Sequence, residues 1–381
     1  MPLDASTHVQ ASDLVGRQVD ELDTPTVLVD LDVLERNIER MADFARQYGV
    51  SLRPHAKTHK TRGVALRQRA AGAAGLTVAK LDEAEAYLAA GFDDLLVANE
   101  VVGADKWRRL VDLQTRGSVA VGLDSREAAD GLNAIASAAG VTVPVLVEVD
   151  SGLRRAGMQP GWPTLSLAEQ VAGLANLRLR GVFTHAGHAY GAASPAEVAR
   201  IGEHEGNVLV ETAALLRERG LACEVVSVGS TPTAMHSGKV PGVTEIRPGN
   251  YVFYDRMQVA LGVATLADCA LSVLVRVISR PDATRAVLDA GSKTFALDRG
   301  AHGMEALPGF GQDRQHGLIL QRLSEEHAVC EVHDQRICVG DRLRIVPNHA
   351  CTVANLADVL VGVRGGRVTE VMQVLVRGGG R

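Results

Sequence analysis

The sequence predicts an α/β protein that consists of a (β/α)8 TIM barrel and a second, mainly β domain. Glycine accounts for 39 of the 381 residues and aromatic residues for only 3%, which suits many tight turns around a core of small aliphatic side chains. Short apolar runs alternate with helix-period segments as far as Tyr254, and beyond it apolar runs follow one another without long helices. The alternation predicts parallel β/α units, and its loss predicts a separate β domain.

The barrel is predicted from eight short runs that are rich in β-branched residues and bounded by turn residues. In chain order these runs are Val50–His55, Leu76–Ala79, Asp94–Asn99, Val119–Asp124, Val143–Asp150, Leu179–His185, Glu224–Ser230 and Glu245–Tyr251. Eight such units match the size of a closed barrel, although a doubly wound open sheet would show the same alternation. We predict the closed barrel, over residues 31–255.

Segments with helical periodicity lie between most of these runs. They include Leu31–Tyr48, Leu81–Ala90, Ser125–Ala138, Leu165–Ala175 and Ala196–Arg219. The segment Thr24–Asp30 is strand-like and precedes the first of these helices, so its position in the chain allows it to pair with either domain.

The second domain is predicted over residues 1–30 and 256–381. Its expected strands are Cys269–Ser279, Ala286–Asp289, Gly317–Leu323, Ala328–Val332, Arg342–Pro347 and Val368–Val376. Because no long helix separates them, they are expected to form a second, all-β domain.

Composition excludes several classes of protein. The formal charge is −5, from 40 basic and 45 acidic residues without a block of like charge, so no nucleic-acid partner is expected. Five cysteines are too few and too widely spaced for a disulfide-stabilised domain. The first 23 residues lack the apolar stretch of a signal peptide, and no run of 18 apolar residues occurs. We therefore expect a cytoplasmic protein without a membrane partner.

Polar residues gather at the ends of the predicted barrel strands, where eight loops converge on the face that carries the chemistry of barrel enzymes. Besides His55 and Lys57 after the first strand, they include Lys80, Asn99, Asp124, Asp150, Arg155, His185, His188 and Tyr190. Strand ends are polar in many proteins, so no single residue is decisive. Together they predict a catalytic site at this face.

Lys57 is the candidate for covalent chemistry. It lies in the segment RPHAKTHK (Arg53–Lys60), where strand alternation would project Arg53, His55 and Lys57 towards the barrel interior. Desolvation would lower the pKa of a lysine there, and the neutral amine is the form that makes a Schiff base. The alternative is a solvated lysine at a strand end, which is our interpretation of Lys60.

Two loops are candidates for a phosphate site. The segment SVGSTPT (Ser227–Thr233) after the seventh strand offers glycine, hydroxyl groups and backbone N–H groups, and the segment Arg247–Asn250 follows at the eighth. Many barrels hold phosphate in these two loops. An ordinary turn has the same composition, so the prediction rests on the position of the loops.

The segment PNHAC (Pro347–Cys351) in the β domain is a candidate metal site. If it is extended, His349 and Cys351 lie on one face and together would bind a cation such as zinc. Two protein ligands leave positions for water or substrate, as at a catalytic metal. The alternative is a chance pair with a buried cysteine.

Three of these segments together resemble the fold-type III pyridoxal 5′-phosphate (PLP) enzymes, the alanine racemase-like group. They are Arg53–Lys60, Gly229–Thr233 and Pro347–Cys351. All three are similar to the metal-dependent branch that contains D-threonine aldolase and eukaryotic-type D-serine dehydratase, and the first and last together are the most specific. The resemblance covers nearly the whole chain and implies PLP and a divalent metal, Mn, Mg or Zn, as cofactors.

The resemblance also implies a role for each matching residue. Lys57 would hold PLP as a Schiff base, Arg155 would contact its phenolic oxygen, and Arg247 would lie beside its pyridine nitrogen. The other residues implied at PLP are His55, Tyr190, Gly229, Ser230, Thr231, Gly249 and Asn250, the last five at its phosphate. His349 and Cys351 match the metal ligands, and Lys57, His188 and Tyr190 are the implied catalytic residues.

The implied reaction is the cleavage of D-threonine to glycine and acetaldehyde. The substrate hydroxyl would bind the metal on His349 and Cys351, and His188 would take its proton before the Cα–Cβ bond breaks. The rival is a D-serine or D-threo-3-hydroxyaspartate dehydratase, in which Lys57 takes the Cα proton and the products are a 2-oxo acid and ammonia. Sequence alone leaves both open, because alignment of the breaking bond decides between them.

Three further functions have less support from the residues. A racemase has no need of His349 or Cys351, and a non-catalytic PLP carrier resembles the barrel alone. The third is a barrel lyase that uses Lys57 without a cofactor. The small-molecule partner expected is a D-3-hydroxy amino acid, and the resemblance implies a homodimer.

Overall fold

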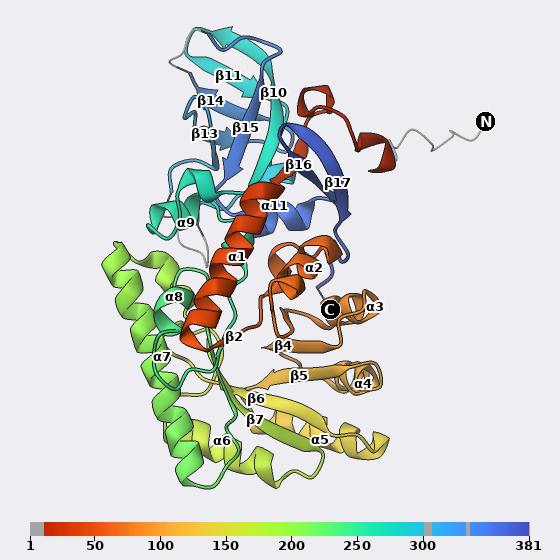
Figure 1. Cartoon of the computed structure of the whole chain (residues 1–381), viewed down its shortest axis with the longest axis vertical. Helices are drawn as coiled ribbons and strands as arrows, with labels where there is room; N and C mark the ends of the chain where they lie inside the picture. Colours follow the sequence, from red (N-terminus) through yellow and green to blue (C-terminus); the bar gives the residue numbers. More distant parts are fainter. Residues whose placement is uncertain (1–10, 301–306, 333–335, 381) are drawn as a thin grey trace, which may run out of the picture. The chain divides into compact units, whose positions relative to one another are not determined.

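The computed structural model describes residues 11–300, 307–332 and 336–380 (Figure 1). Two compact units divide the chain. The barrel unit is formed mainly by residues 37–251, and the β unit by the described parts of 11–36, 252–259 and 264–377.

The barrel unit contains a parallel eight-stranded sheet that is curled and closed, as predicted. Its strands are β2 (Ser51–Leu52), β3 (Leu76–Val78), β4 (Asp94–Glu100), β5 (Ser118–Leu123), β6 (Val143–Glu148), β7 (Leu177–Phe183), β8 (Val225–Val228) and β9 (Glu245–Ile246). They pair in the order β2-β9-β8-β7-β6-β5-β4-β3. A parallel bridge between His55 and Thr77 joins the two ends of this order, so the open-sheet alternative is wrong.

Helices follow most of these strands and lie along the outside of the sheet (Figure 1). They are α2 (Arg62–Ala70), α3 (Leu81–Ala89), α4 (Ala104–Leu113), α5 (Arg126–Ala139), α6 (Trp162–Gly173), α7 (Pro195–Glu218) and the short α8 (Ala234–Ser237). The long α7 begins after a Ser194 side chain that accepts the Glu197 N–H, and Pro195 at its first position needs no donor.

Close packing fixes the interior of the barrel. Leu96, Leu146 and Phe183 form a buried cluster inside it, and a Cβ on Gly122 would lie 2.6 Å from the Phe183 ring. Gly181 has a φ of +148°, and a Cβ there would lie 2.0 Å from the carbonyl oxygen of Val225. Strands β7 and β8 therefore approach as they do only because that position is glycine.

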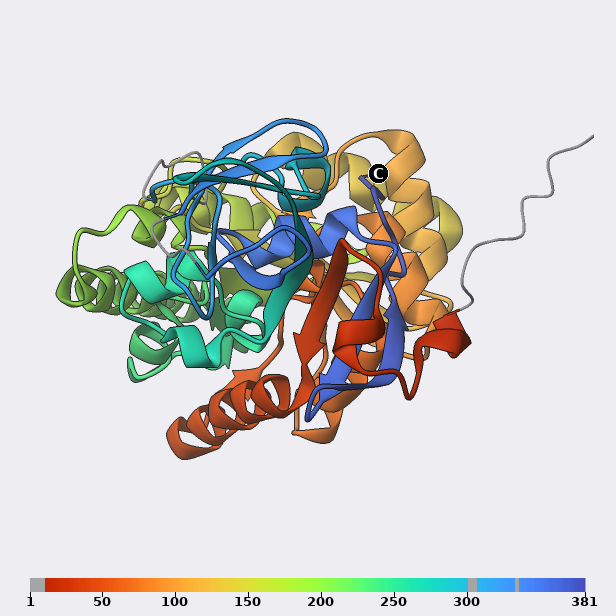
Figure 2. The same cartoon turned by 90° about the horizontal axis from the view of Figure 1, so that it is seen from above.

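The β unit contains a nine-stranded sheet in its described residues. Its strands are β1 (Thr26–Asp30), β10 (Leu271–Asp282), β11 (Arg285–Leu288), β12 (Gly311–Asp313), β13 (Leu320–Leu323), β14 (Ala328–Glu331), β15 (Arg342–Pro347), β16 (Val359–Arg364) and β17 (Arg367–Gln373). Strand β1 pairs antiparallel with β10 and parallel with β16. Figure 2 shows β1 in red beside the blue strands from the other end of the chain.

Several elements of the β unit differ from the expected ones. The strand Thr24–Asp30, left open by the sequence, joins this sheet as β1. Strands β12 and β16 were not predicted. The segment Pro347–Cys351 is not extended throughout, because the short helix α11 begins at Ala350.

Two further observations bear on the composition arguments, and a third concerns helix α1 (Leu31–Tyr48). No helix in the described ranges is both long and apolar enough to cross a membrane. The five cysteines all carry free thiols. Helix α1 begins in the β unit and continues into the barrel unit from Asn37.

Candidate active site

The C-terminal ends of the barrel strands bring most of the predicted residues together. Burial and the positive charges of Lys57, Arg247, His185 and Arg155 hold the pKa of His55 well below its ordinary value. These five groups come from segments after β2, β6, β7 and β9. A site with this excess of cationic groups fits an anionic ligand such as a phosphorylated cofactor.

Lys57 is half-buried in a single 3-10 turn, Ala56–Thr58, and not in a strand as expected. Arg53 does not share its site, because its guanidinium pairs with Asp94 at 2.9 Å and Glu245 at 2.8 Å, at the start of β4 and β9. Lys60 is 7% exposed and pairs with Glu83 at 3.3 Å, so our interpretation of Lys60 as solvated is wrong.

Buried hydrogen bonds hold the turn that carries Lys57. The Nε2 atom of His59 lies 3.2 Å from Gln68 Oε1, and Gln68 Nε2 donates to the Tyr251 hydroxyl at 3.1 Å. Burial lowers the pKa of His59 to about 4, so the imidazole is neutral and serves as a structural link. The chain of contacts connects the lysine turn to the loop after β9.

The two predicted phosphate loops are neighbours. The backbone N–H of Tyr251 donates to Thr231 Oγ1 at 3.2 Å, and this leaves the Thr231 hydroxyl proton for an acceptor such as phosphate. Residues Gly229, Ser230, Thr231, Gly249 and Asn250 are all buried. A Cβ on Gly249 would lie 3.0 Å from the His55 carbonyl oxygen and 2.8 Å from Thr58 Oγ1, so glycine lets this loop approach the lysine turn.

Two backbone N–H groups of the loop Ser227–Thr233 are already hydrogen-bonded within the protein, although the sequence predicted that such groups would be available to a phosphate. The Gly229 N–H donates to Glu205 Oε1 at 3.0 Å, and the Ser230 N–H donates to Thr233 Oγ1 at 3.3 Å. Gly229 has a φ of +128°, and a Cβ there would lie 2.9 Å from the backbone nitrogen of Arg247. Its contribution is therefore backbone shape rather than a donor for the ligand.

Arg247 is buried within a network of its own. Its two terminal nitrogens donate to Ser227 Oγ at 2.6 Å and to the Thr184 carbonyl oxygen at 2.5 Å. Ser227 Oγ donates in turn to Glu245 Oε1 at 2.6 Å. Burial lowers the pKa of Arg247, and its guanidinium lies 5.1 Å from the centre of the Phe183 ring. These contacts hold the guanidinium against Ser227 of β8 and Thr184, which follows β7.

His185, His188 and Tyr190 follow β7. His185 Nδ1 lies 3.0 Å from the Gly229 carbonyl oxygen, and Tyr190 is buried. His188 is half-buried, and burial lowers its pKa while the charge of Asp150 opposes this. Its Nδ1 has no hydrogen-bond partner within the described part of the chain. A neutral imidazole of this kind is suited to accept a proton.

The predicted metal pair lies in the β unit. His349 Nδ1 is 3.0 Å from Asp298 Oδ2, and the His349 and Cys351 side chains are hydrogen-bonded to each other. A carboxylate on one ring nitrogen that leaves the other for a cation is the usual arrangement of a metal-bound histidine. The residues therefore fit a metal, although Cys351 lies in helix α11 and not on an extended strand.

The pair supplies two ligands only. Among the described ranges of the chain, no cluster of three or more His, Cys, Asp or Glu side chains is placed to bind a metal ion. The loop is held from both sides, because Asp255 Oδ2 accepts the Ala350 N–H at 2.9 Å and Asn348 accepts from Arg256 at 2.5 Å. The remaining positions around a cation would belong to water or substrate.

Sequence reasoning missed four acidic residues of these sites: Glu100, Glu148, Glu205 and Asp298. Glu205 had a signal, because it lies on the buried face of α7 among apolar residues. Glu148 ends an apolar strand without any such pattern, and Asp298 lies in a loop with no local signal. Their partners come from distant parts of the chain.

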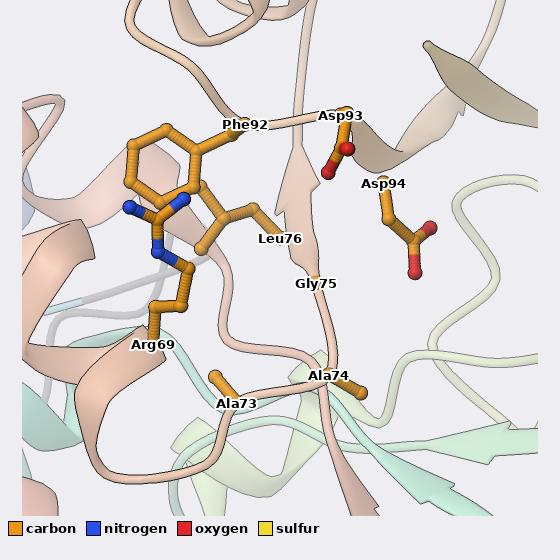
Figure 3. A pocket seen from close by; sticks show the side chains of 8 residues that line it. All are labelled: Arg69, Ala73, Ala74, Gly75, Leu76, Phe92, Asp93 and Asp94. Carbon is orange, nitrogen blue, oxygen red and sulfur yellow. The ribbon is translucent and has the colours of Figure 1, made fainter.

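A small cavity at the opposite end of the barrel strands is not a competing site. It measures about 50 Å³ and lies before β3 and β4, which is room for one or two water molecules. Figure 3 shows the Arg69 guanidinium against the Phe92 ring, 4.7 Å from its centre, with Asp93 and Asp94 on the other side. The cavity is lined by charged side chains and is too small to hold an amino acid.

Comparisons with known proteins agree with this geometry. The family model for the alanine racemase N-terminal domain matches residues 29–257, and the model for a putative serine dehydratase domain matches residues 270–363. The chain is 39% identical to D-threo-3-hydroxyaspartate dehydratase of Delftia sp. over 347 residues, which cover 87% of this chain and 91% of the relative. It is 33% identical to D-threonine aldolase of Arthrobacter sp. over 367 residues, which cover 95% of each.

A solved structure shows the same architecture. The crystal structure of D-threonine aldolase from Filomicrobium marinum superposes with a TM-score of 0.90 at 34% identity, covering 96% of this chain and 98% of the other. The chain belongs to the alanine racemase-like family of fold-type III PLP enzymes, in the branch that joins this barrel to a serine dehydratase domain and includes D-threonine aldolase and D-threo-3-hydroxyaspartate dehydratase.

Proposed function

We propose that the chain is a lyase that uses PLP and a divalent metal ion to cleave D-3-hydroxy amino acids, as a D-threonine aldolase. The observation that carries the proposal is the convergence of Lys57, Arg155 and Arg247 on His55 at the C-terminal ends of the barrel strands. The lysine amine can form a Schiff base with an aldehyde, and the neighbouring cationic side chains can bind an anionic, phosphorylated ligand. The activities named for the curated relatives support the substrate class.

In this proposal the barrel residues bind and orient the cofactor. Lys57 would hold it covalently and then carry a proton to or from the substrate Cα. Ser230 and Thr231 would donate to its phosphate, and Arg155 would meet its phenolic oxygen. PLP, when bound, supplies an electron sink for the bond that breaks at Cα.

The β unit would supply the metal. Solved structures of D-threo-3-hydroxyaspartate dehydratase include a histidine-to-alanine mutant and a cysteine-to-alanine mutant in the metal-free form, with the two substituted residues two positions apart. His349 and Cys351 have that spacing and a supporting carboxylate, Asp298. The metal they hold would act as a Lewis acid on the substrate hydroxyl.

Two reactions meet these requirements. In aldol cleavage, His188 would take the hydroxyl proton, and D-threonine would yield glycine and acetaldehyde. In dehydration, Lys57 would take the Cα proton, and D-serine or D-threo-3-hydroxyaspartate would yield a 2-oxo acid and ammonia. The first is favoured by His188, because burial lowers the pKa of its imidazole and its Nδ1 has no hydrogen-bond partner among the described residues. The second is favoured by the curated relative at 39% identity.

Product analysis with purified protein tests the proposal. The protein would be loaded with PLP and with Mn²⁺, Mg²⁺ or Zn²⁺ in turn, and given D-threonine, D-serine and D-threo-3-hydroxyaspartate. We expect acetaldehyde and glycine from D-threonine. A 2-oxo acid with ammonia assigns the dehydratase reaction instead, and the absence of every product contradicts the lyase.

Substitution of Lys57 separates cofactor binding from turnover. Lys57→Ala should lose the visible absorption of lysine-bound PLP together with activity, because no other amine occupies that position. His349→Ala should keep the absorption and lose turnover. Lys106→Ala, on the outer helix α4, is the matched control and should keep both. An unchanged spectrum in Lys57→Ala would contradict the assignment.

A further inference from the structure

The buried ion pair between Lys60 and Glu83 has no part in the reaction proposed above. The Lys60 ammonium lies 3.3 Å from Glu83 Oε1, and the two side chains are 9% and 2% exposed. Two charges that leave water lose hydration, and this loss offsets their attraction, so a buried pair adds little net stability. Its effect is therefore expected in the conformation that it selects.

Lys60 has a backbone conformation that favours glycine. Its φ is +49°, in the left-handed region, where a side chain crowds the backbone. The His59 and Lys60 N–H groups both donate to the Ala56 carbonyl oxygen, at 3.2 and 2.8 Å. The chain therefore folds back directly after the turn that carries Lys57. Because glycine would make this reversal without strain, the conformation points to a role for the lysine side chain itself.

Glu83 joins Lys60 to the other side of the barrel closure. It lies in the first turn of α3, and its Oε2 accepts the Ala79 N–H at 2.7 Å, just after β3. Backbone pairing between β2 and β3 is short, because β2 has two residues and an isolated bridge joins His55 to Thr77. One carboxylate therefore holds the end of β3 with one oxygen and the segment after β2 with the other.

The turn that carries Lys57 is thus held from both neighbouring strands of β2. On the β9 side the support is the series of hydrogen bonds from His59 through Gln68 to Tyr251. On the β3 side it is the Lys60–Glu83 ion pair. Movement of this turn would displace the Lys57 amine relative to the predicted phosphate loops after β8 and β9.

We propose that the Lys60–Glu83 ion pair fastens the barrel closure beside Lys57 and thereby positions the Lys57 amine for its covalent bond to PLP. The inference rests on the proposed function for the cofactor, whereas the fastening of the turn belongs to the protein alone. Lys60 is a positioning residue and forms no bond to the cofactor. Without the pair, the phosphate loops still bind PLP, but the amine is within reach of its aldehyde for a smaller fraction of the time.

The test variant removes both charges at once. Lys60→Met keeps most of the side-chain length, and Glu83→Gln keeps a carbonyl oxygen for the Ala79 N–H. The double variant leaves no buried charge unpaired, so it should fold. Lys60→Met alone is the second variant, because a buried Glu83 without a partner becomes neutral by taking up a proton. It replaces the double variant if that one does not fold.

The matched control removes a more exposed ion pair from the same helix. Glu85 on α3 pairs with Arg109 on α4 at 2.8 Å, with side chains 39% and 32% exposed. The control variant is Glu85→Gln with Arg109→Met. A pair at the surface contributes little, and this one does not contact the turn that carries Lys57.

The first test measures hydrogen–deuterium exchange by mass spectrometry in protein without PLP. Loss of the pair should ease local opening of the turn, so the His59 N–H should exchange about tenfold faster in the double variant. The substitutions do not adjoin this N–H on its N-terminal side, so its intrinsic exchange rate is unchanged. The control should exchange there as the wild type does. Wild-type exchange of the turn in the double variant would overturn the proposal.

The second test separates the binding of PLP from its attachment to Lys57. Total bound PLP is measured by ultrafiltration, and the attached part by the visible absorption of lysine-bound PLP. At saturating PLP, the attached fraction should fall about fivefold in the double variant, in proportion to the population of the competent conformation. The control should keep the wild-type fraction. A purely structural role would weaken total binding and leave the attached fraction unchanged.

The outcomes distinguish this inference from the proposed function. An unchanged attached fraction in the double variant overturns the positioning role, even if the turn exchanges faster. Wild-type protein that binds no PLP refutes the proposed function instead, and the exchange measurement then decides whether the pair fastens the turn. Faster exchange together with a smaller attached fraction supports the inference.

Discussion

At the scale of single residues, His188 has the environment of a base. Burial lowers its pKa, its Nδ1 has no partner in the described ranges, and a Cβ on Gly152 would lie 3.2 Å from its ring. His188→Gln keeps the size of the side chain but removes the base. We expect kcat for aldol cleavage to fall by about 10² to 10⁴ with a smaller change in KM.

The pH dependence checks the same residue. Because burial lowers the pKa of His188 from its ordinary value, the acid limb of kcat should have its midpoint at a lower pH than an ordinary histidine would give. In His188→Gln that limb should disappear. A variant with an unchanged pH profile and rate would show that another group takes the proton.

Asp298 is predicted to orient a metal ligand rather than to bind the metal. It holds Nδ1 of His349 at 3.0 Å and so directs the other ring nitrogen to the cation. Asp298→Asn should weaken metal affinity by about 10 to 100-fold, measured by metal titration of the metal-free protein. Asp358→Asn, an exposed residue of the same unit, should leave the affinity unchanged.

At the scale of elements, helix α7 holds two active-site loops through one side chain. Glu205 accepts the Ala186 and Gly229 N–H groups, at 3.1 and 3.0 Å, and the Thr233 hydroxyl at 2.8 Å. Glu205→Gln offers one acceptor oxygen where the three donors now meet two. We expect it to lose about 1–3 kcal/mol in the free energy of unfolding, measured by chemical denaturation.

The same helix provides the control for this prediction. Glu203, two residues away, is exposed, and Glu203→Gln should change the free energy of unfolding by no more than about 0.5 kcal/mol. PLP affinity should fall in the Glu205 variant only, since Gly229 begins the predicted phosphate loop. Equal stability of the two variants would contradict the role of Glu205.

Elements differ in how far the sequence predicts them. Six of the eight barrel strands and the five long helices have local patterns, and the structure places each within a few residues of its predicted bounds. The two-residue strands β2 and β9 are defined by their pairing and not by their own pattern. Strand β16 was missed because Gly362 interrupts its apolar run, yet that glycine is required by the packing of Leu31, 3.0 Å from where a Cβ would lie.

At the scale of the whole molecule, the residues predicted to bind PLP and the pair predicted to bind the metal belong to different compact units. Removal of the metal with a chelator is therefore expected to abolish turnover without loss of the absorption of lysine-bound PLP, because no predicted PLP residue lies in the β unit. Restoring Mn²⁺, Mg²⁺ or Zn²⁺ should recover the activity. Turnover that persists after chelation would contradict a metal-dependent reaction. It would be the result expected of a racemase, which does not need the metal.

The sequence predicted the candidate site where its members are neighbours in the chain or follow a strand. Lys57, the Gly229 loop and the pair His349 and Cys351 are of this kind. The electrostatic influence of Glu100 on Glu148 was beyond it, because strand β5 lies between β4 and β6 and neither strand has a pattern that points to the other. Turn geometry at Lys57 was also beyond it, because strand alternation ends at His55.

Closure of the barrel has one consequence for how the protein matures. The first strand pairs with the last, at Ser51 with Glu245 and Leu52 with Ile246, and the bridge between His55 and Thr77 lies two residues before Lys57. A ribosome-bound chain that has not yet emerged beyond Ile246 has an open sheet and no completed setting for the lysine. If Lys57 binds PLP as proposed, we therefore expect the chain to take up the cofactor only after the whole barrel has been synthesised.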